Sequence, residues 1–223
     1  MKGPFERPPE RYYPVFLRLE GRLCVVVGGG KVAERKVEAL LSAGARVRVI
    51  APQVTAELQR WAEEGRIELE LRPYQEGDLS GAWLAIAATD DPEVQKRVFS
   101  EAEARGLFCN VVDKPELCSF IVPSVVRRGR LQLAISTSGA SPATARRIRE
   151  RLEEIFGPEW ALYLELMAYW RQEILSRGLP EEERRALFHR LALAPIPEWI
   201  RQGDWHYLRA LAQKEGLPLP RDL

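Results

Sequence analysis

The sequence lacks the features that mark membrane, secreted and nucleic-acid-binding proteins. No apolar run approaches the roughly 18 residues of a membrane span, and the first ten residues contain three prolines but no apolar signal-peptide core. The 33 basic and 32 acidic residues nearly cancel, so the net charge shows no nucleic-acid footprint. We therefore expect a globular chain of one to three small units that stays in the cytoplasm, with neither a membrane nor a nucleic acid as partner.

Cysteine and histidine are also scarce. Cys24, Cys109 and Cys118 are odd in number and have no metal-ligand spacing, so we expect reduced thiols that pack as small apolar side chains. The two histidines, His189 and His206, lie near the C-terminus and belong to no recognised metal motif. The sequence therefore predicts no metal site.

Glycine, in contrast, is concentrated at one informative place. The apolar residues Val25–Val27 run into Gly28-x-Gly30-x-x-Ala33, which fits the dinucleotide fingerprint. In that fingerprint one glycine allows a tight turn, another lets the backbone approach the phosphates, and the helix N-terminus binds the pyrophosphate. Similar turns also occur without a nucleotide. We predict that the cofactor-binding residues here are Gly28, Gly29, Gly30, Lys31 and Val32.

The N-terminal half alternates apolar strands with helical stretches. This βαβ rhythm predicts an α/β fold with a Rossmann-like parallel sheet. Helices are expected near Lys31–Ala43, Val54–Glu64 and Pro92–Arg105. The five expected strands are Leu23–Gly28, Arg46–Ala51, Ile67–Leu71, Trp83–Ala88 and Phe108–Val112.

After Asp113 the pattern changes. Ser119–Val126 and Leu131–Thr137 flank a turn at Arg127–Arg130, which predicts a hairpin, and Ser141-Pro142 is a typical start for a helix over Ala143–Phe156. From Pro158 onward the chain is predicted to be helical, near Glu159–Ser176, Glu181–Leu191 and Trp205–Glu215. We expect a Rossmann domain over residues 1–115, a small α+β segment over 116–150, and a helical C-terminal domain over 151–223.

The acidic residue that often binds the ribose about 20 residues beyond the first glycine is missing. The chain has Arg48, Val49, Ile50, Ala51, Pro52 and Gln53 there. Arg48 would suit the 2′-phosphate of NADP, but its alternation with Val47 and Val49 is also typical of a strand with one face near solvent.

Several segments occur together in the order and spacing of a known family. They are Tyr13–Leu17, Gly28–Lys36, Leu41–Ala45, Ala87–Asp91, Asn110–Asp113 and Ser136–Pro142. In these segments the chain from about Tyr12 to Leu152 resembles the precorrin-2 dehydrogenase module of siroheme synthases, and the helical remainder is similar only in type.

The resemblance implies NAD-dependent oxidation of precorrin-2 to sirohydrochlorin, with ferrous iron insertion as a second activity in some members. It also implies an intertwined homodimer that forms through the segment after the Rossmann unit. The methyltransferase domain of some relatives has no room in the sequence, so the expectation is a stand-alone dehydrogenase. Because the family uses NAD without the usual acid, backbone groups around Pro52 and the amide of Gln53 are expected to bind the ribose.

Three further residues follow strands at the carboxyl edge of the expected sheet, where ligands bind in open α/β folds. Thr89 and Asp90 are predicted to line the nicotinamide side, although Asp90-Asp91-Pro92 is equally a good helix start. Asp113 is the predicted catalytic residue, because the oxidation also releases a proton and the family ties an aspartate of this motif to dehydrogenation. From sequence alone Asp113 is also consistent with a turn cap before Lys114-Pro115.

The substrate carries many carboxylates, so a cationic rim is expected. Arginines 127, 128, 130, 146, 147 and 149 follow the Rossmann unit; Arg127 and Arg146 are the predicted carboxylate ligands, with a solvated surface as the alternative for each. Asn110 is predicted to orient substrate or nicotinamide, or else to satisfy neighbouring backbone groups. Ser136, Thr137 and Ser138 are predicted to contact substrate or to cap the next helix. Thr137 stands where some relatives carry a phosphorylated serine.

A second class of function is also consistent with the sequence. A Rossmann module that senses NAD would report to a partner through the aromatic-rich helical tail, whose aromatics are also typical of core or dimer packing. A sensing module has no need of Asp113, so substitution of this residue separates the two hypotheses.

Overall fold

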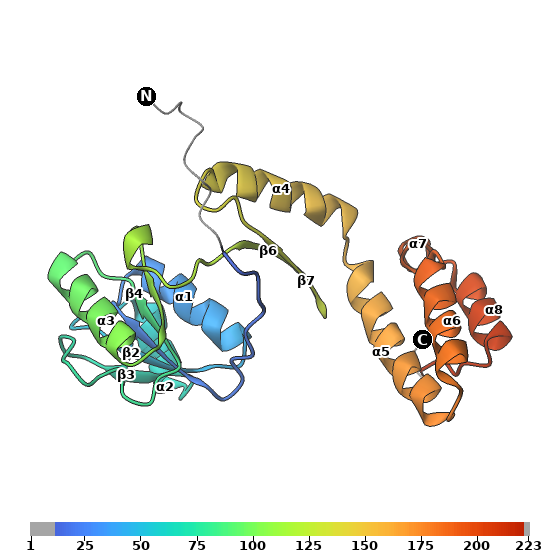
Figure 1. The fold of residues 1–223 in the computed structure, drawn as a ribbon, viewed down its shortest axis with the longest axis horizontal. Coiled ribbons are helices and arrows are strands. Elements are labelled where there is room, and N and C mark those ends of the chain that lie inside the picture. The colour runs from blue at the N-terminus through green and yellow to red at the C-terminus, as the bar shows by residue number, and fades with distance from the viewer. Residues whose placement is uncertain (1–11, 221–223) are drawn as a thin grey trace. The chain divides into compact units, whose positions relative to one another are not determined.

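The computed structural model describes residues 12–220, and the chain divides into two compact units after Val122. In the first unit, five parallel strands form one sheet in the order β3-β2-β1-β4-β5 (Figure 1). This order confirms the predicted Rossmann-like sheet. The strands are β1 (Leu23–Val27), β2 (Arg46–Ile50), β3 (Glu68–Glu70), β4 (Leu84–Ala87) and β5 (Phe108–Val111).

Helices cover both faces of this sheet because successive strand residues point to opposite sides. On one face, Val26 packs with residues of α1 (Lys31–Ser42) and α2 (Ala56–Glu63). On the other face, Val25 and Val27 pack with residues of α3 (Pro92–Ala104). Four of the five β1 residues are buried, as expected of a central parallel strand.

The sequence suggested that the Rossmann part ends at residue 115, but chain packing extends the unit to Val122. A short 3-10 turn, η1 (Pro115–Leu117), follows β5, and the chain then returns along that strand. The backbone N–H of Ser119 donates to the carbonyl of Cys109 (2.9 Å), and the Ser119 hydroxyl accepts from the Cys109 N–H (2.8 Å). These bonds tie residues 118–120 to the sheet.

The second unit begins with the predicted hairpin, whose first strand starts later than predicted. β6 (Ser124–Arg128) pairs antiparallel with β7 (Leu131–Ile135), and Gly129 in the turn has a φ of +55°. The expected strand over Ser119–Val126 was wrong in its first half, because residues 118–120 are bonded to β5 instead. Helix α4 (Pro142–Ile155) follows, capped by the Ser141 side chain with proline in its first turn as predicted.

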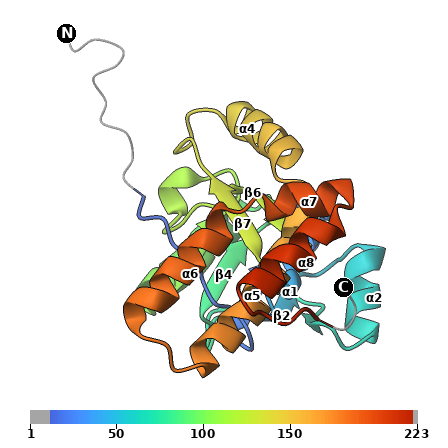
Figure 2. The ribbon, with the colours of Figure 1, turned by 90° about the vertical axis from the view of Figure 1, so that its right-hand side faces the viewer.

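The remaining helices, labelled α5 to α8 in Figure 2, pack around an apolar core of their own. They are α5 (Glu159–Ser176), α6 (Glu181–Leu193), α7 (Ile196–Gln202) and α8 (Trp205–Lys214). Trp170 of α5 and Leu191 of α6 are fully buried in this core. Helix α7 is not among the predicted helices. Pro197 lies in its first turn, where a missing N–H costs no helical bond. Within residues 12–220, no helix has the length and apolarity to cross a bilayer.

Candidate functional site

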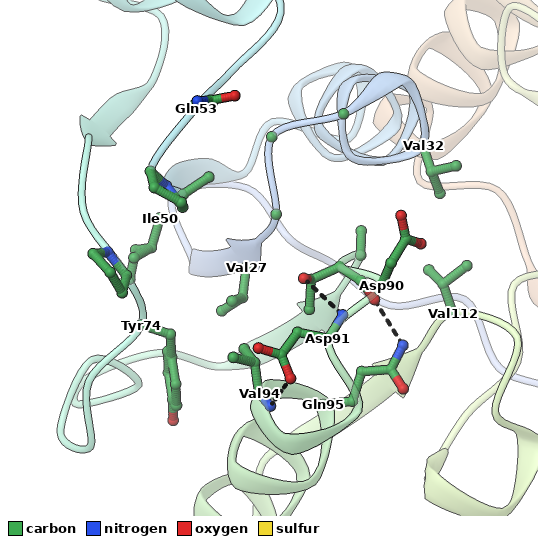
Figure 3. Close-up of a pocket in the computed structure, with 18 of the residues that line it drawn as sticks. Val27, Val32, Ile50, Gln53, Tyr74, Asp90, Asp91, Val94, Gln95 and Val112 are labelled. Carbon is green, nitrogen blue, oxygen red and sulfur yellow. Dashed lines mark hydrogen bonds between the residues drawn. The ribbon is translucent and has the colours of Figure 1, made fainter.

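A cavity of about 840 Å³ lies at the carboxyl edge of the parallel sheet (Figure 3). Loops that follow all five strands contribute to its wall. Asp113, the predicted catalytic residue, is part of this wall. So are all the predicted cofactor-binding residues, which are Gly28, Gly29, Gly30, Lys31, Val32, Pro52, Gln53, Thr89 and Asp90.

The glycine loop fits tightly between its neighbours on two sides. Gly28 has a φ of +130°, and a Cβ atom there would overlap the carbonyl oxygen of Ala88 after β4. A Cβ on Gly29 would overlap the carbonyl of Gln53 after β2. A Cβ atom on Gly30 would have no neighbouring atom within 4 Å. Two glycines are therefore required by packing, whereas the third leaves open space at the start of α1.

The N-terminus of α1 is suited to an anion. Gly30 is its N-cap residue, and within the described chain no side chain caps this helix, whereas Thr55 caps α2 and Asp91 caps α3. The first N–H groups of a helix have no intrahelical acceptor, and the helix dipole adds positive potential there. The open space at Gly30, the uncapped helix and the cavity volume fit a dinucleotide whose pyrophosphate binds at this helix end.

The Lys31 side chain lies at the wall of the cavity, next to this anion site. Its ammonium group pairs with Glu34 on the next turn (2.9 Å). The carboxyl pKa of Glu34 is lowered by hydrogen bonds from Thr55 and Lys31. Because 76% of the Lys31 side chain is exposed, this pair is weak in water and leaves the ammonium group available to an anion.

Arg48 is occupied by carboxylates of the neighbouring strand. Its guanidinium donates to Glu68 (2.9 Å) and lies 3.7 Å from Glu70. Only 26% of the Arg48 side chain is exposed. The arginine that would suit a 2′-phosphate is thus already neutralised on the β2–β3 surface.

The loop after β4 separates the roles of two neighbouring aspartates. Asp91 caps α3, since its Oδ1 accepts from the N–H groups of Glu93 (2.9 Å) and Val94 (3.3 Å). Asp90 lines the cavity, and its carboxylate has no hydrogen-bond or ion-pair partner among the described residues. The carbonyl of Thr89 accepts from the Gln95 side chain (2.7 Å), as the dashed line in Figure 3 shows. In this loop, Asp91 therefore caps the helix, and the carboxylate of Asp90 is available to a ligand.

Asp113 has an unusual backbone. Its φ is +60°, and among the described non-glycine residues only Ser138 shares a positive φ. The turn closes through the N–H of Lys114, which donates to the carbonyl of Val111 (3.2 Å). The Asp113 side chain is exposed and makes no hydrogen bond within residues 12–220, so it does not cap this turn. Its carboxylate is available at the cavity wall, and strained positions of this kind cluster at functional sites.

Lys36, which the sequence analysis did not single out, approaches Asp113 from α1. Burial lowers the pKa of its ammonium group and Arg35 adds to this effect, while the charges of Asp113 and Cys118 oppose it. Lys36 forms no ion pair within the described chain. The Asp113 turn thus lies beside a half-buried cation.

Asn110 lies beneath the site rather than in its wall. It is buried, and its side-chain amide donates to the carbonyl of Phe120 (3.0 Å) and to the sulfur of Cys118 (3.5 Å). The amide therefore satisfies the backbone of the returning segment, which was the alternative given for it.

The other predicted substrate-binding residues belong to the second unit. Ser136 Oγ accepts from the N–H of Ser138 (2.9 Å), and Thr137 Oγ1 bonds to the backbone of Ser141 (3.1 Å) just before α4. Arg146 pairs with Glu150 (2.9 Å), whereas Arg127 is exposed and forms no ion pair within the described residues.

Some residues of the cavity wall were not predicted from the sequence. Pro73 and Tyr74 come from the loop after β3, and Gln95 is a buried glutamine of α3. No motif marks them, because they are distant in sequence from the glycine loop and come together only when the sheet has formed. Among the described residues, no group of three or more histidine, cysteine, aspartate or glutamate side chains is placed to bind a metal.

Comparisons with known proteins give a consistent result. A family model described as putative NAD(P)-binding matches residues 15–124, and one described as sirohaem biosynthesis protein central matches residues 128–155. The siroheme synthase of Nitrosococcus oceani is 39% identical over 194 residues, which are 87% of this chain and 42% of that protein. The siroheme synthase of Xylella fastidiosa is 43% identical over 191 residues, which are 85% of this chain and 40% of that protein.

A solved structure is similar over nearly the whole chain. It is described as SirC, precorrin-2 dehydrogenase, and is 29% identical with a TM-score of 0.77, covering 91% of this chain and 100% of that one. The chain spans about two fifths of the length of the curated siroheme synthases that it matches.

Proposed function

Because the chain belongs to the siroheme synthase family over residues 15–155, we propose that it catalyses the NAD-dependent oxidation of precorrin-2 to sirohydrochlorin. The observation that carries this proposal is the free Asp113 carboxylate in the wall of a cavity whose glycine loop and uncapped helix fit a dinucleotide. The similarity to a solved precorrin-2 dehydrogenase supports the substrate.

The reaction removes a hydride and a proton from the reduced tetrapyrrole. NAD supplies the hydride acceptor when it is bound. The glycine loop and the α1 N-terminus bind the pyrophosphate, and Asp113 accepts the proton at its carboxylate. The turn that places Asp113 at the carboxyl end of β5 presents that carboxylate on the side of the sheet where ligands bind.

NAD rather than NADP is the expected cofactor. A 2′-phosphate needs an unpaired cation near the end of β2, and Arg48 is already paired with Glu68 and Glu70. The ribose hydroxyls are left to the backbone near Pro52 and to the exposed amide of Gln53.

The acidic side chains of the substrate are expected to bind arginines of the second unit, with Arg127 and Arg146 as the proposed ligands. Arg127 has no competing carboxylate within the described chain, and Arg146 has only the exposed pair with Glu150, which is weak in water. Ser136, Thr137 and Ser138 are proposed as further contacts.

A homodimer is part of the proposal. The β6–β7 hairpin is a two-stranded sheet that packs against α4 and α5 of the same chain. Helix α4 buries Ala145 but leaves Ile148 and Ile155 exposed. A second copy that covers these surfaces would stabilise them, and sedimentation or light scattering of the purified protein measures the mass of the assembly. Cytoplasmic location and ferrous iron insertion remain predictions.

The decisive experiment is anaerobic incubation of purified protein with enzymatically made precorrin-2 and NAD. The sirohydrochlorin spectrum and NADH absorbance are followed together. We expect both products to form in equal amounts. Binding of NAD without turnover would contradict the dehydrogenase and support the alternative, an NAD-sensing module that signals through its helical tail.

A further inference from the structure

One buried carboxylate of the Rossmann unit takes no part in the proposed reaction. Glu101 lies on α3 with 6% of its side chain exposed. It accepts hydrogen bonds from the Tyr74 hydroxyl, from the N–H groups of Gly77 (3.0 Å) and Leu79 (3.3 Å), and from Arg105 (2.8 Å). Burial alone would raise its pKa, but these donors lower the pKa overall. Because burying a carboxylate is costly, the bonds that it makes to the loop after β3 need an explanation.

The residue that Glu101 fixes is Tyr74, whose ring forms part of the cavity wall. Tyr74 is 4% exposed and lines the large cavity on one side and a smaller one of about 390 Å³ on the other. Figure 3 shows its hydroxyl turned away from the glycine loop. The Arg97 guanidinium lies 5.4 Å from the ring centroid and donates to the Tyr74 carbonyl (3.4 Å). Tyr74 is therefore fixed by contacts to its hydroxyl, to the face of its ring and to its backbone carbonyl.

The position of Tyr74 in the sheet order indicates which part of the ligand it meets. Pro52 and Gln53 follow β2, and Pro73 and Tyr74 follow β3, so these residues form the wall on one side of the glycine loop. In Rossmann sheets the end of β2 contacts the adenosine ribose. The half of the cavity near Asp113 is left for the nicotinamide.

This adenosine half has few polar groups for recognition. No carboxylate from the end of β2 is available for the ribose, and Arg48 is paired elsewhere. Affinity at this end therefore depends on the shape of the wall as well as on the backbone near Pro52 and the amide of Gln53. A wall residue on an irregular loop gives a defined shape only when the loop is fixed.

We propose that Glu101 is a positioning residue for cofactor binding, which through Tyr74 fixes the wall against which the adenosine half of NAD binds. This inference rests on the proposed function, since it takes the cavity to be the NAD site.

The test uses calorimetry with the two halves of the cofactor as separate probes. ADP-ribose reports the adenosine end and nicotinamide mononucleotide reports the other end. In Glu101→Gln, an NH2 group replaces one carboxylate oxygen, and the hydrogen bonds that this oxygen accepts from N–H groups are lost. We expect the Kd for ADP-ribose to rise roughly five- to tenfold, in line with the net contribution of one ordinary hydrogen bond. The Kd for nicotinamide mononucleotide should not change. Glu103→Gln, an exposed position on the same helix, is the matched control and should match the wild type.

Three further experiments distinguish this positioning role from a mere loss of folding stability. In turnover assays Glu101→Gln should raise the KM for NAD with kcat unchanged. Tyr74→Phe keeps the ring but removes the hydroxyl, and it provides the same test if Glu101→Gln does not fold. The double variant should bind ADP-ribose about as Glu101→Gln does, because a residue that acts through Tyr74 has no further effect once that bond is gone.

Equal ADP-ribose affinity in the wild type, Glu101→Gln and Tyr74→Phe would overturn this inference and leave the proposed function intact. Equal weakening for both half-cofactors would also overturn it, since the effect would not be local to the adenosine end. A wild-type protein that binds neither ADP-ribose nor NAD would overturn the proposed function itself and this inference with it.

Discussion

Gly29 and Gln53 pack backbone against backbone: a Cβ atom on Gly29 would overlap the carbonyl oxygen of Gln53. The carbonyl of Gly29 also accepts a hydrogen bond from the N–H of Thr55 (2.9 Å). The glycine loop after β1 is thereby joined to the segment after β2. The fold therefore requires glycine at positions 28 and 29, where a Cβ would overlap backbone atoms, whereas only a bound ligand would require it at position 30.

Substitution of the three glycines should have two different outcomes. Gly29→Ala and Gly28→Ala should destabilise the protein by about 2–4 kcal/mol, because each Cβ meets a backbone carbonyl. Gly30→Ala should fold normally, since its φ of −83° suits alanine and its Cβ meets nothing within 4 Å. It should nevertheless weaken NAD binding roughly tenfold, because the methyl group enters the phosphate space. Denaturant unfolding and calorimetry measure the two effects, and a Gly30→Ala variant with normal NAD affinity would contradict this pyrophosphate site.

Replacement of Asp113 should separate chemistry from cofactor binding. Asparagine is the suitable substitute because it tolerates the positive φ of this position, whereas alanine adds strain. We expect Asp113→Asn to lower kcat by roughly 10²–10⁴-fold, the usual contribution of a general base. The Kd for NAD should stay within experimental error of the wild type. Wild-type turnover in this variant would remove Asp113 from the mechanism.

The three thiols should differ in reactivity. Burial raises the pKa of Cys24 to about 11 and that of Cys109 to about 12. It also raises the pKa of Cys118, but this thiol is only partly buried. At pH 8 iodoacetamide should modify the native protein only at Cys118, since the thiolate is the reactive form and access is required. Mass spectrometry should find one modified thiol in the native state and three after denaturation. Cys118→Ser should give none in the native state, and rapid native labelling of Cys109 would contradict the packing of β5.

Acid should weaken the helical core through Glu159. This carboxylate is 7% exposed; burial opposes ionisation, but hydrogen bonds from Arg201, its own N–H and the N–H of Gly157 lower its pKa below the usual value. A folded pKa below the unfolded value of about 4.3 contributes stability above that pH, and the contribution is lost as the pH falls through the folded pKa.

Glu159→Gln should therefore lower stability by about 1–3 kcal/mol at pH 7 and by much less near pH 3. Urea unfolding at both pH values, followed by tryptophan fluorescence, measures the difference. Glu154→Gln removes a charge from an exposed position and serves as the control, with no expected change. A loss of equal size at both pH values for Glu159→Gln would show that packing rather than charge matters.

The parallel sheet, the family and the dinucleotide-binding character followed from the sequence alone, because their signals are local. Alternating apolar runs and helical stretches predict β1 to β5, and the glycines after β1 predict the loop that the structure shows. Ser141-Pro142 and the long α5 stretch predicted helix starts correctly. Each of these features depends on neighbours within a few residues, and a sequence read along the chain contains them.

Tertiary structure decided which polar side chains satisfy the fold and which are available to a ligand. Asn110 is bonded to Phe120, and Asp91 rather than Asp90 caps α3. Glu101 reaches back to Tyr74, 27 positions earlier in the chain. Such hydrogen bonds depend on how the backbone returns to the sheet, and their partners are distant in sequence. Residue types and spacing therefore predicted the loops that form the site, whereas tertiary packing determined the hydrogen-bond partner of each side chain.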